Sequence, residues 1–231
     1  MKLVLFDIDG TLLASEGAGK RAITRALTEI FGSAGPDDYH YDGKTDPQIV
    51  RELMKLDGKD DKVIDARMPA VLNLYLENLN YELRAPDRKA PRQLAGVGKL
   101  LDALEARSDV VLGLLTGNVE RGARLKLDAV GIEFSRFRVG AFGSDHERRP
   151  QLPAIARERC RRQTGAFLNG ADVVVIGDTP DDLQCGRSIG ATAFGVATGR
   201  FSVPQLLEHK PAAAFEDLSD TEDVLEAIFG S

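Results

Sequence analysis

Two aspartates directly follow the first apolar run of the chain. The run Leu3–Phe6 leads into Asp7-Ile8-Asp9-Gly10-Thr11, so two carboxylates leave a predicted buried strand two positions apart. Alternate side chains of a strand point to the same face, which places Asp7 and Asp9 to share one site. Such a pair can supply a nucleophile or metal ligand and a general acid–base group, although Asp-Gly is also a common strand-ending turn.

Polar residues also follow two later apolar runs. Val110–Leu115 leads into Thr116-Gly117-Asn118, and Val173–Ile176 leads into Gly177-Asp178-Thr179-Pro180-Asp181-Asp182. In a parallel sheet these carboxyl ends meet at one edge, where open α/β folds bind ligands. The hydroxyl and backbone N–H groups of the first segment suit a phosphate at a helix start, although Thr116 and Asp178 could each simply cap a helix.

Four carboxylates would meet at this edge of the sheet. They belong to Asp7, Asp9, Asp178 and Asp182. Negative charges at such short distances repel one another, and a bound cation or proton reduces this repulsion. Mg²⁺ prefers oxygen ligands, so the cluster predicts a magnesium site.

The elements that must position these residues alternate from Val97 onward. Near-continuous apolar strands separated by helices favour an α/β fold, with a parallel sheet covered on both faces. The later predicted strands are Phe137–Phe142, Thr192–Ala197 and Ala212–Phe215; the predicted helices are Val97–Leu104, Val119–Val130, Pro150–Arg162, Pro180–Ile189, Val203–His209 and Thr221–Phe229.

Residues 14–87 break this alternation. They hold three amphipathic helix patterns, around Ile23–Ile30, Asp46–Leu56 and Val63–Leu83, with no convincing strand. Ala85–Gln93 is rich in proline and charge and reads as a linker back to the sheet. We therefore expect a core of residues 1–13 and 88–231, with a helical cap domain over residues 14–87.

Composition limits the classes of function. The 231 residues are 43% hydrophobic and carry a formal charge of −6, which fits a globular protein and disfavours nucleic acid and anionic membranes as partners. No apolar run approaches the ~18 residues of a membrane span, and no signal peptide precedes the first strand. Only two cysteines occur, Cys160 and Cys185, and they form no Cys-x-x-Cys pair, so we expect a cytoplasmic protein. We expect it to be either a monomer or a homodimer.

The three polar segments together, in this order, resemble motifs one, two and four of the haloacid dehalogenase superfamily. The similarity covers essentially the whole chain and is greatest to its phosphoglycolate phosphatase and β-phosphoglucomutase-like branch. It implies a Rossmann-like three-layer core with an inserted all-helical cap. It also implies that Asp7 is the nucleophile that forms an aspartyl phosphate, and that Asp9 is the general acid and base.

The resemblance further implies a ligand set. Mg²⁺ would be bound by the carboxylates of Asp7 and Asp178 and by the backbone carbonyl of Asp9, with Asp182 in direct or water-mediated contact. Thr116 would hold a phosphoryl oxygen. The phosphate- or substrate-binding positions are Gly10, Gly117 and Asn118.

The basic residue of motif three is less clearly marked. The family places a Lys or Arg before motif four, and here Asp145-His146-Glu147-Arg148-Arg149-Pro150 opens a predicted helix. We choose Arg149, next to the helix start, over Arg148, although both could be solvated charges. Lys126 is a poorer choice because it lies deep in the helix after motif two.

The loop Asp42-Gly43-Lys44-Thr45-Asp46 reads either as a plain loop with a helix cap or, by resemblance, as the specificity loop of the cap, with Lys44 contacting substrate. We expect a Mg²⁺-dependent phosphatase, a phosphoric monoester hydrolase acting on a small phosphorylated metabolite. A phosphosugar mutase is the alternative, and a non-catalytic phosphate-binding protein a remote one. Residues 15–25 lack the His that the mutase branch uses. The second motif-one aspartate, Asp9, disfavours dehalogenase activity.

Overall fold

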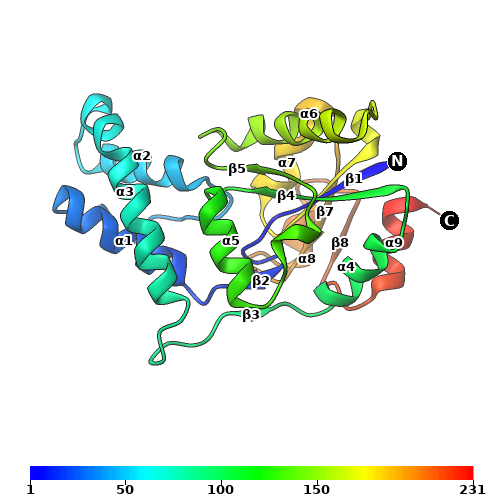
Figure 1. Cartoon of the computed structure of the whole chain (residues 1–231), viewed down its shortest axis with the longest axis horizontal. Coiled ribbons are helices and arrows are strands. Elements are labelled where there is room, and N and C mark those ends of the chain that lie inside the picture. Colours follow the sequence, from blue (N-terminus) through cyan, green and yellow to red (C-terminus); the bar gives the residue numbers. More distant parts are fainter. Residues whose placement is uncertain (231) are drawn as a thin grey trace.

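The computed structural model describes residues 1–230 and contains a six-stranded parallel sheet, covered by helices, with a helical module beside it (Figure 1). The strand order is β5-β4-β1-β6-β7-β8. This arrangement confirms the predicted α/β fold. The strands are β1 (Lys2–Phe6), β4 (Val110–Thr116), β5 (Val139–Phe142), β6 (Val173–Gly177), β7 (Thr192–Val196) and β8 (Ala213–Phe215).

Both faces of the sheet are buried. In β1, Val4 and Phe6 pack toward α4 (Val97–Glu105), α5 (Glu120–Ala129) and α9 (Thr221–Phe229). The alternate residues Leu3 and Leu5 pack on the other face, against α6 (Leu152–Thr164) and Cys185 of α7 (Pro180–Cys185). Burial on both sides explains why these strands are continuously apolar instead of alternating.

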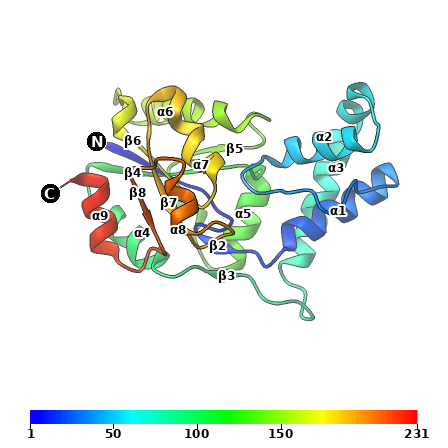
Figure 2. The ribbon, with the colours of Figure 1, turned by 180° about the vertical axis from the view of Figure 1, so that it is seen from behind.

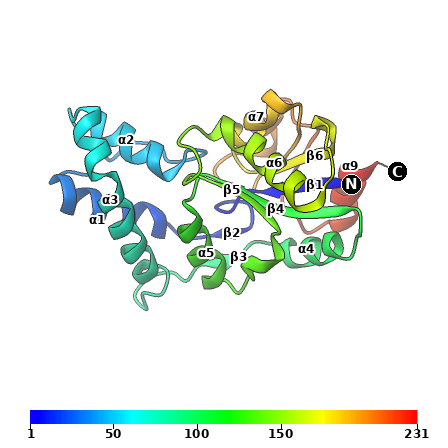
Figure 3. The same cartoon turned by 45° about the horizontal axis from the view of Figure 1, so that its top comes forward.

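The helical module consists of α1 (Ala18–Phe31), α2 (Asp46–Leu56) and α3 (Asp61–Glu82). Its three helices match the three amphipathic patterns in this part of the sequence. They enclose a separate apolar cluster that includes Ile23, Leu53 and Tyr75. The module lies at the end of the sheet away from the N-terminus of β1, so the carboxyl ends of the parallel strands point toward it (Figures 1 and 3). The exact domain limits stay a prediction.

A small antiparallel pair, absent from the sequence prediction, joins the two connections to the module. Strand β2 (Leu13–Ala14) pairs with β3 (Arg92–Gln93), within the stretch read as a linker. The chain thus leaves for the module and returns from it at the same place (Figure 2). Just after β2, Glu16 adopts a φ of 50°, in the left-handed region that few non-glycine residues occupy.

Two predicted helices are each split by a 3₁₀ turn. The first becomes η2 (Arg149–Gln151) followed by α6, and the second becomes α7 followed by η4 (Gly186–Ile189). Such turns are common at helix ends, and periodicity alone does not separate them from the α-helix. The remaining elements are α8 (Val203–Leu207), η1 (Phe134–Arg136) and η3 (Gly170–Asp172). Within residues 1–230, the helices are all too short or too polar to cross a membrane.

Candidate active site

Three neighbouring strands bring the predicted site residues together. Asp7 follows β1, Thr116 ends β4, and Asp178 follows β6, and β1 lies between the other two in the sheet. All three side chains are buried, with at most 6% of the surface of each residue exposed. The edge predicted from the sequence therefore exists as a compact group of polar residues within an apolar core.

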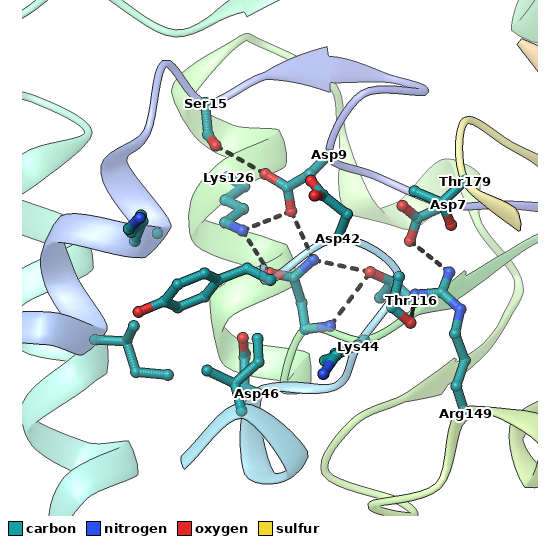
Figure 4. Close-up of a pocket in the computed structure, with 18 of the residues that line it drawn as sticks. Asp7, Asp9, Ser15, Asp42, Lys44, Asp46, Thr116, Lys126, Arg149 and Thr179 are labelled. Carbon is teal, nitrogen blue, oxygen red and sulfur yellow. Dashed lines mark hydrogen bonds and ion pairs between the residues drawn. The ribbon is translucent and has the colours of Figure 1, made fainter. Parts of the chain in front are cut away.

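These residues line a cavity of about 220 Å³ between the sheet edge and the helical module (Figure 4). The sheet side contributes both motif-one aspartates, and the module contributes residues of α1, α2, α3 and the loop before α2. The lining residues are Asp7, Asp9, Ser15, Gly17, Gly19, Lys20, Ile23, Tyr41, Asp42, Gly43, Lys44, Asp46, Ile49, Tyr75, Thr116, Gly117, Asn118, Lys126, Arg149, Asp178 and Thr179.

Arg149 is the basic residue beside Asp7. Its Nη2 atom lies 3.0 Å from Oδ1 of Asp7, and it also forms an ion pair with Asp182. Arg149 is 4% exposed, whereas Arg148 is exposed to solvent. The structure thus places Arg149, and not Arg148, between two buried carboxylates; its role as the basic residue of motif three stays a prediction.

The distances, burial and pKa values of the acidic residues show whether they fit a metal ion. Oxygen atoms of Asp7, Asp178 and Asp182 lie within 4.8 Å of one another. Among residues 1–230, the buried Oδ1 of Asp7 makes no well-aligned hydrogen bond and has only its ion pair with Arg149. Burial raises the pKa of Asp7 to about 7. The positive charge of Arg149 opposes this rise, and the negative charges of Asp182 and Asp9 add to it. The site thus holds more negative charge than its own cations compensate, and oxygen ligands fit Mg²⁺.

The three carboxylates are not equally free to bind a metal ion. Asp182 accepts hydrogen bonds from both the backbone N–H and the hydroxyl of Thr179 at one oxygen, and it pairs with Arg149 at the other. Asp178 accepts a hydrogen bond at Oδ1 from Thr11 at 3.2 Å and has no ion pair among residues 1–230, and burial raises its pKa well above the usual value. We therefore expect Asp7 and Asp178 to be the carboxylate ligands, with Asp182 holding the site together.

Asp9 lies outside this acidic group. Its Oδ1 accepts a hydrogen bond from Ser15 at 2.8 Å, and its Oδ2 accepts from Asn118 at 2.9 Å and Lys126 at 2.6 Å. Burial opposes ionisation of Asp9, but Lys126 and these hydrogen bonds outweigh it and hold the pKa of the carboxyl below its usual value. The two motif-one aspartates therefore have opposite electrostatic surroundings.

Lys126 is the residue that the sequence analysis missed. It was considered only as a partner of the nucleophile, and the structure instead places it beside Asp9 and Asn118, with Nζ 2.6 Å from Oδ1 of Asn118. A signal was present in the sequence: Lys126 lies on the same face of α5 as the buried residues Ala123 and Leu127. A lysine on an apolar helix face calls for a specific partner.

Glycines allow the backbone to approach closely at two points. A Cβ atom on Gly117 would collide with the backbone carbonyl of Lys44 in the helical module. Gly10 has a φ of 80°, and the carboxylate of Asp178 fills the space where its Cβ would be. Between these points, the hydroxyl of Thr116 accepts hydrogen bonds from the backbone and the side-chain amide of Asn118.

Lys44 lines the cavity but is already paired. Its Nζ atom donates to the hydroxyl of Tyr39 at 3.0 Å and forms an ion pair with Glu52. Both partners belong to the helical module, so its charge is largely neutralised there. A contact between Lys44 and substrate stays a prediction and requires this ion pair to loosen.

Comparison with known proteins agrees with this geometry. A family model described as haloacid dehalogenase-like hydrolase matches residues 4–196. A search of curated proteins gives no match.

Solved structures share the fold over nearly the whole chain. A hydrolase from Pseudomonas syringae has a TM-score of 0.72 at 20% identity, covering 98% of both chains. A structure named as a predicted phosphoglycolate phosphatase from Haemophilus somnus has a TM-score of 0.68 at 20% identity, covering 97% of this chain and 98% of its own. A provisionally named β-phosphoglucomutase from Thermotoga maritima has a TM-score of 0.60 at 22% identity, covering 98% of this chain and 99% of its own.

Proposed function

Because the chain belongs to the haloacid dehalogenase-like hydrolase family, we propose that it is a Mg²⁺-dependent phosphatase acting on a small phosphorylated metabolite. The observation that carries the proposal is the environment of Asp7. Its buried Oδ1 atom forms an ion pair with Arg149 at 3.0 Å but makes no well-aligned hydrogen bond within residues 1–230, and oxygen atoms of Asp178 and Asp182 lie close by. A carboxylate in this state is available to a metal ion and to a phosphoryl group.

The reaction would proceed in two transfers. In the first, an Asp7 oxygen attacks phosphorus, the ester P–O bond breaks, and Asp9 donates a proton to the leaving oxygen. In the second, Asp9 takes a proton from water as that water attacks phosphorus, which releases inorganic phosphate and regenerates Asp7. A Mg²⁺ ion held by Asp7, Asp178 and the Asp9 carbonyl would neutralise charge on the phosphoryl oxygens.

Other residues of the chain would bind and orient the phosphoryl group. Arg149 supplies a fixed positive charge beside Asp7, and a guanidinium suits bidentate contact with phosphate. The hydroxyl of Thr116 and the backbone N–H groups around Gly117 and Asn118 lie at the start of α5, where helix geometry favours anions. Electrostatic positioning of this kind is the main source of catalysis in phosphoryl transfer.

The helical module would choose the leaving group. It covers the carboxyl ends of the strands, and the cavity of about 220 Å³ lies below the roughly 300–1,000 Å³ of typical sites for drug-sized ligands. Closer docking of the module over this cavity would also exclude bulk water from the reacting atoms. The volume favours a leaving group of a few carbon atoms.

The test is release of phosphate from p-nitrophenyl phosphate in the presence of Mg²⁺. Wild type should turn over, and Asp7→Asn should lose at least about 10³-fold in kcat, because an amide is a far poorer nucleophile and metal ligand. Asp87→Asn makes the same chemical change at an exposed position and should behave as wild type. Near-normal turnover by folded Asp7→Asn would exclude Asp7 as the nucleophile, and an inactive wild type would favour a non-catalytic phosphate-binding protein.

A phosphosugar mutase is the second candidate, because a provisionally named β-phosphoglucomutase shares the fold. The groups that bind the Asp9 carboxylate are Ser15, Asn118 and Lys126, and residues 15–25 contain no His. We therefore expect water to be the final acceptor. Incubation with β-glucose 1-phosphate and a trace of the 1,6-bisphosphate should release phosphate, if anything, and form little glucose 6-phosphate. Rapid isomerisation would favour the mutase.

A further inference from the structure

Helix α5 begins without a cap of its own. The residue at its N-cap position is Val119, which has a φ of −64° and a ψ of 146° and whose aliphatic side chain makes no capping hydrogen bond. The first N–H groups of a helix have no partner within the helix and must find one elsewhere. The residues immediately before this helix start, Thr116 to Asn118, are those proposed to bind phosphate, so their conformation depends on how the helix start is held.

Asp46, the first residue of α2 in the helical module, supplies one of the missing acceptors; the hydroxyl of Ser144 supplies another, to the N–H of Glu120 at 3.2 Å. The Oδ2 atom of Asp46 accepts a hydrogen bond from the backbone N–H of Val119 at 2.8 Å. Its own backbone N–H donates to the carbonyl of Gly117, also at 2.8 Å. One residue of the module therefore binds both ends of the segment Gly117–Val119.

The fit between the two parts is close at this point. Asp46 is only 7% exposed, although it is an acidic residue at a helix start. The carbonyl of Lys44 occupies the space that a Cβ on Gly117 would need. Figure 4 shows Asp46 on the ribbon of the helical module, on the side of the cavity away from Asp9. A carboxylate buried here without a specific role would be costly.

We propose that Asp46 is a positioning residue that caps helix α5 from the helical module and so holds Gly117–Val119 in the phosphate-binding conformation only while the module is docked. The inference rests on the proposed function, because it assumes that this segment binds a phosphoryl group. The two equilibria are then linked: docking of the module tightens phosphate binding, and phosphate favours docking by the same factor. A substrate phosphate would thereby favour the closed, water-excluding state.

The first test does not depend on phosphate. Amide hydrogen exchange measured by NMR reports directly on the N–H of Val119. Asp46→Ala should speed exchange of that amide by at least about 10-fold, because a charge-assisted hydrogen bond is lost. The matched control is Arg51→Gln: Arg51 also joins the module to the sheet side, through Glu147 at 2.7 Å, and its other partners are Asp61 and Asp65. Arg51→Gln should leave Val119 exchange within about twofold of wild type.

The second test measures the inhibition constant of inorganic phosphate with Mg²⁺ present. Asp46→Ala should raise it by about 3- to 30-fold, the usual range for loss of a helix cap. Asp46→Asn keeps an acceptor oxygen and should stay near wild type, whereas Asp46→Leu keeps the volume without an acceptor and should resemble Asp46→Ala. Arg51→Gln should again have little effect.

A change on the donor side keeps the proposal testable even where an Asp46 variant does not fold. Val119→Pro deletes the N–H, and the φ of −64° already suits proline. It should raise the inhibition constant as Asp46→Ala does, and combining the two should add little. Equal effects of Asp46→Ala and Arg51→Gln, or none from either, would overturn the capping role. A wild type that ignores phosphate while the exchange result holds would instead overturn the proposed function.

Discussion

The Nζ atom of Lys126 lies 2.6 Å from Oδ2 of Asp9, a residue 117 positions earlier in the chain. Arg149 lies 3.0 Å from Asp7 on the other side of the same strand end. The two aspartates thus have one cation each, but only Asp9 is also saturated with hydrogen bonds. Their pKa values move in opposite directions, upward for Asp7 and downward for Asp9. The proposed roles need the opposite order, with Asp7 ionised and Asp9 protonated, so Mg²⁺ bound beside Asp7 and an anionic phosphate bound beside Asp9 would have to reverse these shifts.

Lys126→Met should lower kcat by about 10²-fold with little change in the fold. Lys126 orients both Asp9 and Asn118, and small displacements of catalytic groups cost about this much. Arg124→Met is the matched control, because Arg124 lies on the same helix but forms an exposed pair with Glu120. Steady-state kinetics with an aryl phosphate, beside thermal unfolding, would show the difference. Equal kinetics for the two variants would mean that the Lys126 contact has no catalytic consequence.

Asp9→Asn should separate substrates by their leaving groups. Aryl phosphates with good leaving groups need no proton and should be affected least, whereas alkyl phosphates should lose a further factor of about 10²–10⁴, the usual contribution of general acid–base catalysis. The measurement is kcat/KM for a series of esters of increasing leaving-group pKa. A loss of the same size on every ester would indicate that Asp9 acts through structure or metal binding instead.

Mg²⁺ should raise the melting temperature of wild type and not that of Asp178→Asn. Ligand binding stabilises the folded state, by about 2.7 kcal/mol at 100 times Kd. Asp181→Asn, next to this site but outside the acidic group, should respond to Mg²⁺ as wild type does.

Replacing Mg²⁺ with Ca²⁺ should inhibit turnover, because Ca²⁺ is larger and accepts bidentate carboxylates, which would immobilise Asp7. Full activity with Ca²⁺ would show that Asp7 is not a direct ligand.

Asp46 should make stability depend on pH in a defined window. Burial, partly offset by Lys126 and the hydrogen bond from Val119, raises its pKa from 3.8 to about 6. The folded protein therefore binds more protons than the unfolded chain between about pH 4 and 6, and the free energy of unfolding contributed by Asp46 falls as pH rises through this window. The contribution is fully present below about pH 4 and is lost above about pH 6.

The measurement compares wild type with Asp46→Asn by urea denaturation at several pH values. The stability difference between the two should change by roughly 1.4 kcal/mol for each unit of pKa shift, against wild type as pH rises, and then stay constant. A difference that is the same at pH 4 and pH 7 would mean that Asp46 is not protonated on folding in this range.

The parts of the site that follow strand ends could be predicted from the sequence. Asp7, Thr116 and Asp178 each come directly after an apolar run, and parallel strands put such positions at one edge whatever the details of packing. Arg149 could be selected because it stands next to a helix start. The paired strands flanking the helical module were missed, because two-residue strands carry no periodicity to detect.

Contacts that depend on how two elements face one another were not predictable in this way. Lys126 contacts Asp9 because of how α5 is oriented against the loop that follows β1. Asp46 contacts Val119 because of how the helical module packs on the sheet domain. Asp46 could be read from the sequence as part of a helix start or a specificity loop, but nothing local indicates that it caps a different helix. The substrate contact predicted for Lys44 likewise competes with an ion pair to Glu52 inside the helical module, which the sequence does not reveal.

The pairing of Ala14 with Arg92 has a consequence for protein engineering. Because the chain re-enters the sheet domain beside the point where it left, the intervening segment is an insertion between two paired strands, and its removal would leave two ends that a tight turn could bridge. In a chain with Ala14 joined to Arg92 through Asn-Gly, the carboxyl ends of the parallel strands would be open to solvent. The insertion could also be exchanged for that of another family member; under the proposed function this would transfer leaving-group preference between scaffolds while Asp7, Thr116 and Asp178 remain in place.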